Sequence, residues 1–190
     1  HKDVTLIEVR DASDNVLYGY LLLDLYPRPN KYSHAAHAGI MHGTIDKQGN
    51  IAKPGVSVLL ANFPKSTATK PSLLRHDDVT TFFHEFGHAI HSLLGTTQLA
   101  SFAGTNVKTD FVEMPSQMLE QWMYEPEILN KVSGIINRLS NSMSIPPHSA
   151  IEICNGMMVT SFRNIYIIGT VWSDSNLNVL SSSSLGQFTL

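Results

Sequence analysis

Residues 84–88 read His-Glu-Phe-Gly-His, an HExxH pattern whose residue types and spacing could bind a metal ion. Side chains four residues apart on a helix differ by about 40° around its axis, so His84 and His88 could bind the same ion. Glu85 would project beside them and could reach a water molecule held by the ion without being a ligand itself. The pattern therefore predicts a catalytic metal centre with two histidine ligands and Glu85 as general base.

A catalytic zinc ion usually has three protein ligands, so a third ligand is needed. His91 lies on the same helix face, but one straight helix does not readily wrap three ligands around an ion, and a packing or outer role suits His91 better. Glu113 is the better candidate because Glu113, Gln117 and Glu120 share one face of the next predicted helix. The alternative is that Glu113 only completes a capping box with Asp110.

Gln117 and Glu120 lie one and two turns after Glu113. They could accept hydrogen bonds from the ligand imidazoles, or they could simply form an exposed polar face. Other histidines, at positions 34, 37 and 42, lack ligand spacing and do not predict a second metal site.

The HExxH residues lie in a helix predicted from Asp77 to Leu94, with Gly95 as the C′ residue that ends it. Its apolar residues recur at helical spacing on the side opposite the histidines: Val79, Phe82, Phe83, Phe86, Ile90, Leu93 and Leu94. A second helix is predicted to start at 110–113 and to run to about Tyr124, because Pro115 is tolerated only near a helix start. A third is predicted over about 127–139.

The first third of the chain is rich in β-branched and apolar residues. Residues 4–10 and 16–25 flank a turn-prone run and predict a hairpin, and residues 38–45 and 56–63 predict two further strands around a turn at 46–50. The predicted fold class is α+β, with a small, mainly antiparallel sheet followed by the helices that hold the site.

Longer stretches of sequence resemble a known family. The runs FFHEFGHAIHSLL and FAGTNVKTDFVEMPSQMLEQWMYEPEIL are similar to the active-site segment of the M3 metallopeptidases, of the thimet oligopeptidase type. LLLDLYPRPNKYSHAAHAG and LLANFPKSTATKPSLLRHDDV resemble the stretches that precede that segment, so the similarity covers about residues 16–140.

This resemblance implies a zincin-like arrangement within a larger, mostly helical fold. It implies one Zn²⁺ ion, with the glutamate of the FVE-x-PSQ motif, here Glu113, as the third ligand. It also implies an endopeptidase acting on short peptides. The family's downstream histidine and tyrosine residues, which stabilise the tetrahedral intermediate, have no match here, so a zinc-binding remnant with weak catalysis is the alternative function.

The resemblance divides the chain into a partial catalytic core at 1–140 and a divergent or truncated segment at 141–190. The net charge of −3, without any run of lysine or arginine, argues against nucleic acid or an anionic membrane surface as partners. No stretch approaches the roughly 18 apolar residues of a membrane span. With a single cysteine, a soluble cytoplasmic or organellar protein is favoured, although the compartment stays open.

Overall fold

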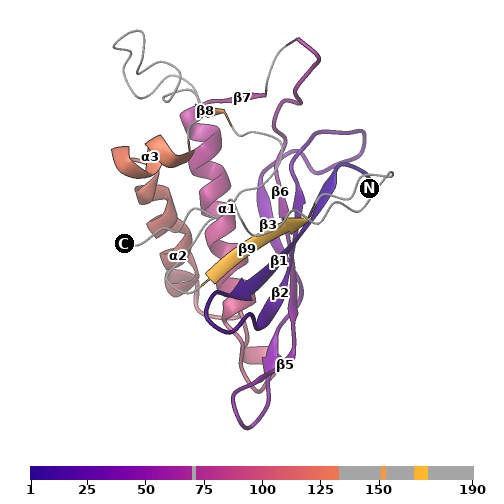
Figure 1. Cartoon of the computed structure of the whole chain (residues 1–190), viewed down its shortest axis with the longest axis vertical. Coiled ribbons are helices and arrows are strands. Elements are labelled where there is room, and N and C mark those ends of the chain that lie inside the picture. Colours follow the sequence, from indigo (N-terminus) through magenta and orange to yellow (C-terminus); the bar gives the residue numbers. More distant parts are fainter. Residues whose placement is uncertain (70–71, 133–150, 153–164, 171–190) are drawn as a thin grey trace.

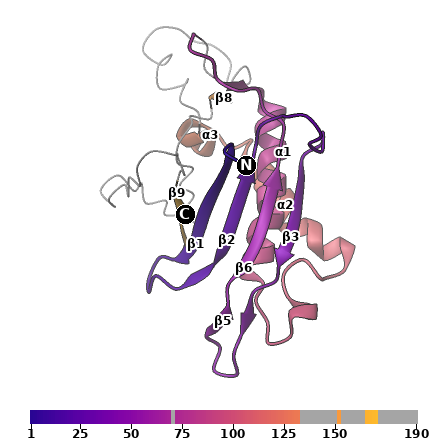
Figure 2. The same ribbon diagram turned by 90° about the vertical axis from the view of Figure 1, so that its right-hand side faces the viewer.

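The computed structural model describes residues 1–69, 72–132, 151–152 and 165–170. Within these residues, helices cover one face of a twisted β-sheet (Figures 1 and 2). The first two strands, β1 (Val4–Asp11) and β2 (Leu17–Asp24), form the predicted antiparallel hairpin. The mixture of a small sheet and a few helices agrees with the predicted α+β class.

The main sheet has five strands in the order β3-β6-β2-β1-β9. Its other members are β3 (Ala36–Met41), β6 (Gly55–Leu60) and β9 (Ile165–Thr170). Three neighbouring pairs are antiparallel, whereas β2 and β6 are parallel. The sheet is therefore mainly antiparallel, as predicted. The parallel pair arises because the chain first crosses to the edge as β3 and then returns as β6 into the gap beside β2.

The strand predicted at 38–45 is interrupted. Its second part, β4 (Thr44–Ile45), leaves the main sheet and pairs with β5 (Ile51–Lys53) around the predicted turn. Two more short strands, β7 (Leu73–Leu74) and β8 (Ile151–Glu152), pair with each other.

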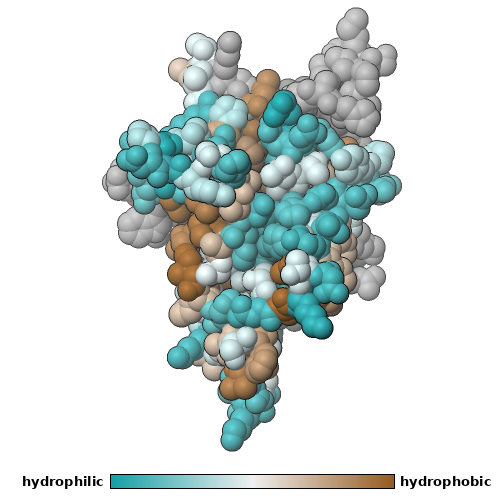
Figure 3. All heavy atoms as spheres, turned by 180° about the vertical axis from the view of Figure 1, so that it is seen from behind, coloured by the Kyte–Doolittle hydropathy of each residue, from teal (hydrophilic) through white to brown (hydrophobic). Residues whose placement is uncertain are grey.

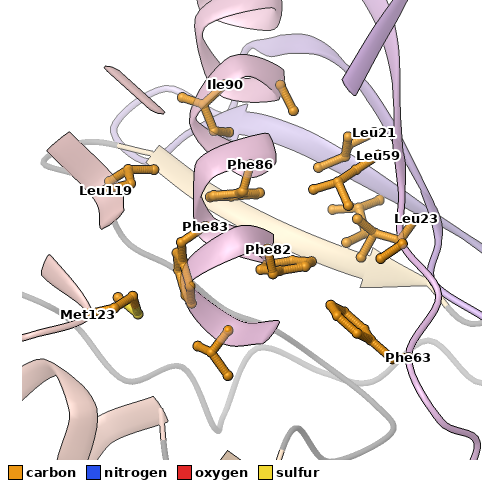
Figure 4. Close-up of a cluster of buried hydrophobic side chains, with 14 of the residues drawn as sticks. Leu21, Leu23, Leu59, Phe63, Phe82, Phe83, Phe86, Ile90, Leu119 and Met123 are labelled. Atoms are coloured by element: carbon orange, nitrogen blue, oxygen red, sulfur yellow. The ribbon is translucent and has the colours of Figure 1, made fainter. Parts of the chain in front are cut away.

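Helix α1 (His76–Leu94) holds the HExxH residues, as predicted, and packs its apolar face on the sheet. Phe82 and Phe86 face Leu21 and Leu59, and all four side chains are almost fully buried (Figure 4). Alternate residues of β2 and β6 point toward the helix because side chains along a strand alternate between its two faces. This packing fixes the rotation of α1 and turns its histidine face toward the edge strand β3 rather than the middle of the sheet.

Gly95 does end α1, but it is not left-handed as a C′ glycine usually is, because its φ is −74°. The reason for glycine is close packing. A Cβ atom here would lie 2.8 Å from the carbonyl oxygen of His91 and 3.0 Å from the Cα atom of Gly104. Gly104 itself has the positive φ, 63°, which favours glycine.

After a short 3₁₀ turn, η1 (Ala100–Phe102), the chain enters α2 (Thr109–Trp122) and then α3 (Pro126–Val132). Helix α2 starts one residue before the predicted range and ends two residues early. Pro115 therefore lies inside the helix, where it removes one helical hydrogen bond, and the prediction that it must stand near the start was wrong.

Residues 133–139 of the predicted third helix lie outside the described residues, as does the predicted boundary near residue 140. None of the helices in the described part of the chain is long and apolar enough to cross a membrane.

Candidate metal centre

Helices α1 and α2 run antiparallel against each other. Near the start of α1, His76 Nε2 lies 2.8 Å from the carbonyl oxygen of Met123, just after the end of α2. Near the end of α1, the ring of His91 packs edge-on against Phe111 in the first turn of α2, with ring centroids 5.9 Å apart. The middle of α1, with the HExxH residues, therefore faces the middle of α2.

The two helices come into backbone contact at Gly87, the glycine inside the HExxH pattern. A Cβ atom there would lie 2.5 Å from the Cα atom of Ser116 and 2.8 Å from the carbonyl oxygen of Pro115. Both contacts involve backbone atoms, which cannot swing aside as a flexible side chain could. Glycine at this position thus lets α2 come close enough to place Glu113 beside the histidines.

His84, His88 and Glu113 are the one group in the described chain whose nitrogen and oxygen atoms could share a metal ion, all lying within 4.8 Å of one another. Glu113 Oε2 lies 3.5 Å from His84 Nε2 and 3.2 Å from His88 Nε2. Zinc bonds of about 2.0–2.2 Å in a tetrahedral arrangement put ligand atoms about 3.3 Å apart. The donor set and its spacing therefore fit a zinc ion.

Ser116 holds the Glu113 carboxylate in place. Its hydroxyl lies 2.8 Å from the carbonyl oxygen of Glu113 and 2.9 Å from Glu113 Oε2, to which it can donate. Ser116 is fully buried, so this contact is shielded from water. The sequence analysis did not predict a role for Ser116. Its position one helical turn after Glu113 could have indicated this contact.

The capping-box interpretation of Glu113 was wrong. The N-cap of α2 is Lys108, not Asp110, so Glu113 lies in the second turn and cannot occupy the N3 position. Its carboxylate is directed toward α1 instead.

Glu120 lies behind His84. A carboxylate oxygen of Glu120 is in hydrogen-bonding contact with His84 Nδ1. If Nδ1 carries the proton and donates it to Glu120, the lone pair of Nε2 is left facing Glu113 and His88. The arrangement fixes both the ring orientation and the tautomer that a metal ligand needs.

Glu85 is half-buried and makes no hydrogen bond or ion pair in the described part of the chain. Its position on α1 is turned by about 60° from His88 around the helix axis. Glu85 thus lies next in sequence to His84, on a neighbouring part of the helix surface, and its carboxylate is not engaged by another described side chain.

The other two sequence candidates lie apart from the three-donor group. Gln117 is exposed on α2 and makes no hydrogen bond to a ligand histidine among the described residues. His91 is half-buried, and its Nδ1 atom is buried without a hydrogen-bond partner in the described chain. Burial, with a smaller contribution from the nearby His88, lowers the pKa of His91.

His37, on the edge strand β3, packs against the site from the sheet side. Its ring centroid lies 6.2 Å from that of His88. Burial is the main cause that lowers the pKa of His37 to about 4, and nearby histidines add to it. His37 therefore stays neutral at pH 7, and neither it nor His34 or His42 joins the metal-binding group of the described residues.

The space-filling view from behind shows a broad hydrophilic surface bordered by apolar patches (Figure 3). Exposed apolar side chains on α2 include Phe111, Met114 and Met118. The described residues leave these three side chains uncovered.

The chain is similar to known proteins over most of its length. Residues 1–157 match the sequence profile of peptidase family M3. The chain is 45% identical to a thimet-like oligopeptidase of Dictyostelium discoideum over 136 residues, and 43% identical to saccharolysin of Saccharomyces cerevisiae over 138 residues. Each alignment covers 70% of this chain but only 20% and 19% of the respective relative.

A mitochondrial intermediate peptidase of Homo sapiens is 30% identical over 166 residues, which is 87% of this chain and 23% of that protein. The chain thus spans about a fifth of the length of the curated relatives it matches. The match to the family profile confirms the resemblance over more of the chain than residues 16–140. This chain belongs to peptidase family M3.

Proposed function

We propose that this chain is the core of a zinc-dependent endopeptidase that hydrolyses short peptides. The observation that carries the proposal is the convergence of two imidazole nitrogens and one carboxylate oxygen within 4.8 Å, with the uncommitted Glu85 beside them. This donor set, two histidines and a glutamate, is one that catalytic zinc sites use.

In this proposal, His84, His88 and Glu113 hold the ion, and Ser116 and Glu120 orient two of these ligands. When bound, zinc supplies a Lewis acid that acts on the water and on the scissile carbonyl.

Glu85 accepts the proton of the attacking water and later delivers it to the nitrogen of the leaving amine, so that the carboxylate is regenerated. No side chain forms a covalent bond to the substrate. The nucleophile is water.

The substrate class rests on the relatives. The names of the Dictyostelium protein and of an Escherichia coli relative, 41% identical over 135 residues, both contain the word oligopeptidase. Since this chain matches about a fifth of their length, the preference for short peptides is a proposal for this chain.

A second candidate function is zinc binding with weak catalysis. It would describe residues 1–190 taken by themselves, in which no position matches the family's downstream histidine and tyrosine donors. Developing charge on a tetrahedral intermediate needs preorganised donors, and the loss of one such donor typically costs about 10²–10³ in rate. The two candidates share the metal site and differ in turnover.

The decisive experiment compares the zinc-loaded chain with its Glu85→Gln variant on an internally quenched fluorescent peptide. We expect both proteins to retain about one zinc per chain, and the variant to lose hydrolysis by about 10²–10⁴ because the base is removed. Glu127→Gln, the same chemical change at an exposed position of α3, serves as the control. Zinc binding without turnover above a chelated sample would favour the second candidate, and near-normal turnover of Glu85→Gln would refute the role of Glu85.

A further inference from the structure

A pocket of about 340 Å³ opens beside the metal centre, on the side of His84 away from His88. Both helices contribute to its walls: Asp77, Thr80, Thr81 and His84 come from α1, and Glu120 and Tyr124 come from α2. The pocket therefore shares one wall, His84, with the three-donor group and lies within reach of a peptide held there.

The α1 residues of the pocket follow one helix face toward the metal centre. Around the helix axis, Asp77 and Thr81 lie within about 60° of His84. Along the axis, Asp77 and His84 are seven residues apart, which is about 10 Å. An extended peptide advances about 3.3 Å per residue, so the pocket reaches side chains within about three residues of the scissile bond.

The lining of the pocket is polar and acidic. Every lining residue carries a polar side-chain atom, and two of the residues are carboxylates, whereas none is a lysine or arginine. Glu120 is in contact with His84, but Asp77 makes no hydrogen bond or ion pair with a described residue. The nearest cation in sequence, Arg75, is paired with Asp78 at 3.4 Å and has only a weaker electrostatic interaction with Asp77.

These features indicate which kind of side chain the pocket could bind. The lining offers carboxylate and hydroxyl oxygens and contains no lysine or arginine side chain. An apolar side chain would leave these acceptors without partners, whereas an ammonium or guanidinium group would supply several donors and an opposite charge.

We propose that this pocket is a subsite for a basic side chain of the peptide substrate, with Asp77 as its charged anchor and the hydroxyl of Thr81 as a further acceptor. The inference rests on the proposed peptidase function and adds a preference to it. Because Asp77 is exposed, the preference is modest, about two- to fivefold, as for other exposed ion pairs.

The test measures binding rather than turnover, in zinc-loaded protein whose hydrolysis is stopped by Glu85→Gln. Fluorescein-labelled octapeptides carry one lysine or one norleucine at the same position, and each of the four central positions is tested in turn. Fluorescence anisotropy gives the affinity ratio of each pair. We expect a two- to fivefold preference for lysine at one position at least, which Asp77→Asn removes without weakening the norleucine peptide.

Asp110→Asn is the matched control, because Asp110 occupies the same position in the first turn of α2 as Asp77 does in α1 and does not line the pocket. It removes the same charge from the same part of a helix, so any general effect of net charge or of the helix dipole appears in both variants. We expect the lysine preference to survive this change and to decline at high salt.

The outcomes separate the subsite from the peptidase. The subsite would be overturned if no peptide bound, or if lysine were preferred at none of the positions. It would also be overturned if the preference persisted in Asp77→Asn or fell equally in Asp110→Asn. Cleavage is assayed separately, in the protein that keeps its native Glu85. If that protein cleaves no peptide, and the lysine preference is present and depends on Asp77, the peptidase proposal fails and the subsite stands.

Discussion

Helix α1 has two seams that differ in kind. The seam with the sheet is apolar and closed: Phe82, Phe86 and Leu93 are nearly fully buried there. The seam with α2 is built around Gly87 and Ser116, small residues that bring backbone close to backbone, and it is flanked by histidines and carboxylates. The contact with the sheet sets the position of the helix, whereas the contact with α2 determines which polar groups lie beside its histidines.

This difference shows how one helix can contribute both to the stability of the fold and to a metal site. Apolar burial is worth about 25 cal/mol per Å², independent of direction, so the sheet seam tolerates many apolar combinations. A metal site instead depends on distances of a few tenths of an ångström between ligand atoms. Changes in the first seam should therefore alter folding, and changes in the second should alter metal binding.

The largest expected effect breaks the sheet seam. Phe82→Ala should lower the free energy of unfolding by about 3–5 kcal/mol, because it leaves a cavity among fully buried side chains. Urea denaturation of the zinc-free chain measures this loss, with Phe82→Leu as a milder change if the alanine variant does not fold. Phe102→Ala, at an exposed phenylalanine of η1, should cost less than about 0.5 kcal/mol. Equal losses in Phe82→Ala and Phe102→Ala would contradict the picture of a closed seam.

Removal of Glu113, the proposed third ligand, tests the contact with α2 in the opposite way. Glu113→Ala should weaken zinc binding more than about 100-fold, beyond the 10–100-fold typical of residues that only support a ligand. Stability without metal should change little, since Glu113 is only half-buried. Competition with a chromophoric chelator measures the affinity. Full zinc occupancy of this variant at limiting metal would mean that the third ligand is a different residue, with His91 the first to be tested.

A methyl group at the closest contact should disturb both properties. Gly87→Ala puts a Cβ atom 2.5 Å from the Cα atom of Ser116, so the helices must separate, at a cost of about 1–3 kcal/mol. Zinc affinity should fall as well, because Glu113 moves with α2 while the two histidines stay on α1. Thermal unfolding and zinc titration check the two effects together. A stable Gly87→Ala protein with normal zinc affinity would show that the site does not depend on this close approach.

The smallest expected effect concerns the residue behind the ligand. Glu120→Gln should weaken zinc binding about tenfold, near the lower end of the range for such contacts, because a neutral amide orients His84 but does not raise its basicity. Zinc affinity, compared with that of Glu127→Gln, is the measurement. An unchanged affinity would place Glu120 outside the metal centre.

Local periodicity was enough to predict much of the helix α1. The spacing of its apolar residues predicted its bounds and its buried face, and the four-residue step between His84 and His88 follows from helix geometry alone. The hairpin of β1 and β2 was predictable for a similar reason, since two alternating runs flank a turn-prone segment. In each case the interacting residues are close in sequence, so the physics that joins them is local.

Only the tertiary structure decided how the third donor reaches the first two. Glu113 is 29 positions beyond His84 in the chain, and the helical pattern of α2 allowed both a capping role and a ligand role. The close contact of Gly87 with Ser116 sets the distance and rotation between the two helices, and it brings the Glu113 carboxylate beside the two histidines. The sequence pattern of α2 also places Met114 and Met118 on its apolar stripe, yet the helix packs through Ser116 and Leu119 and leaves both methionines exposed. Helix contacts depend on shape at the point of closest approach, which hydrophobic periodicity does not encode.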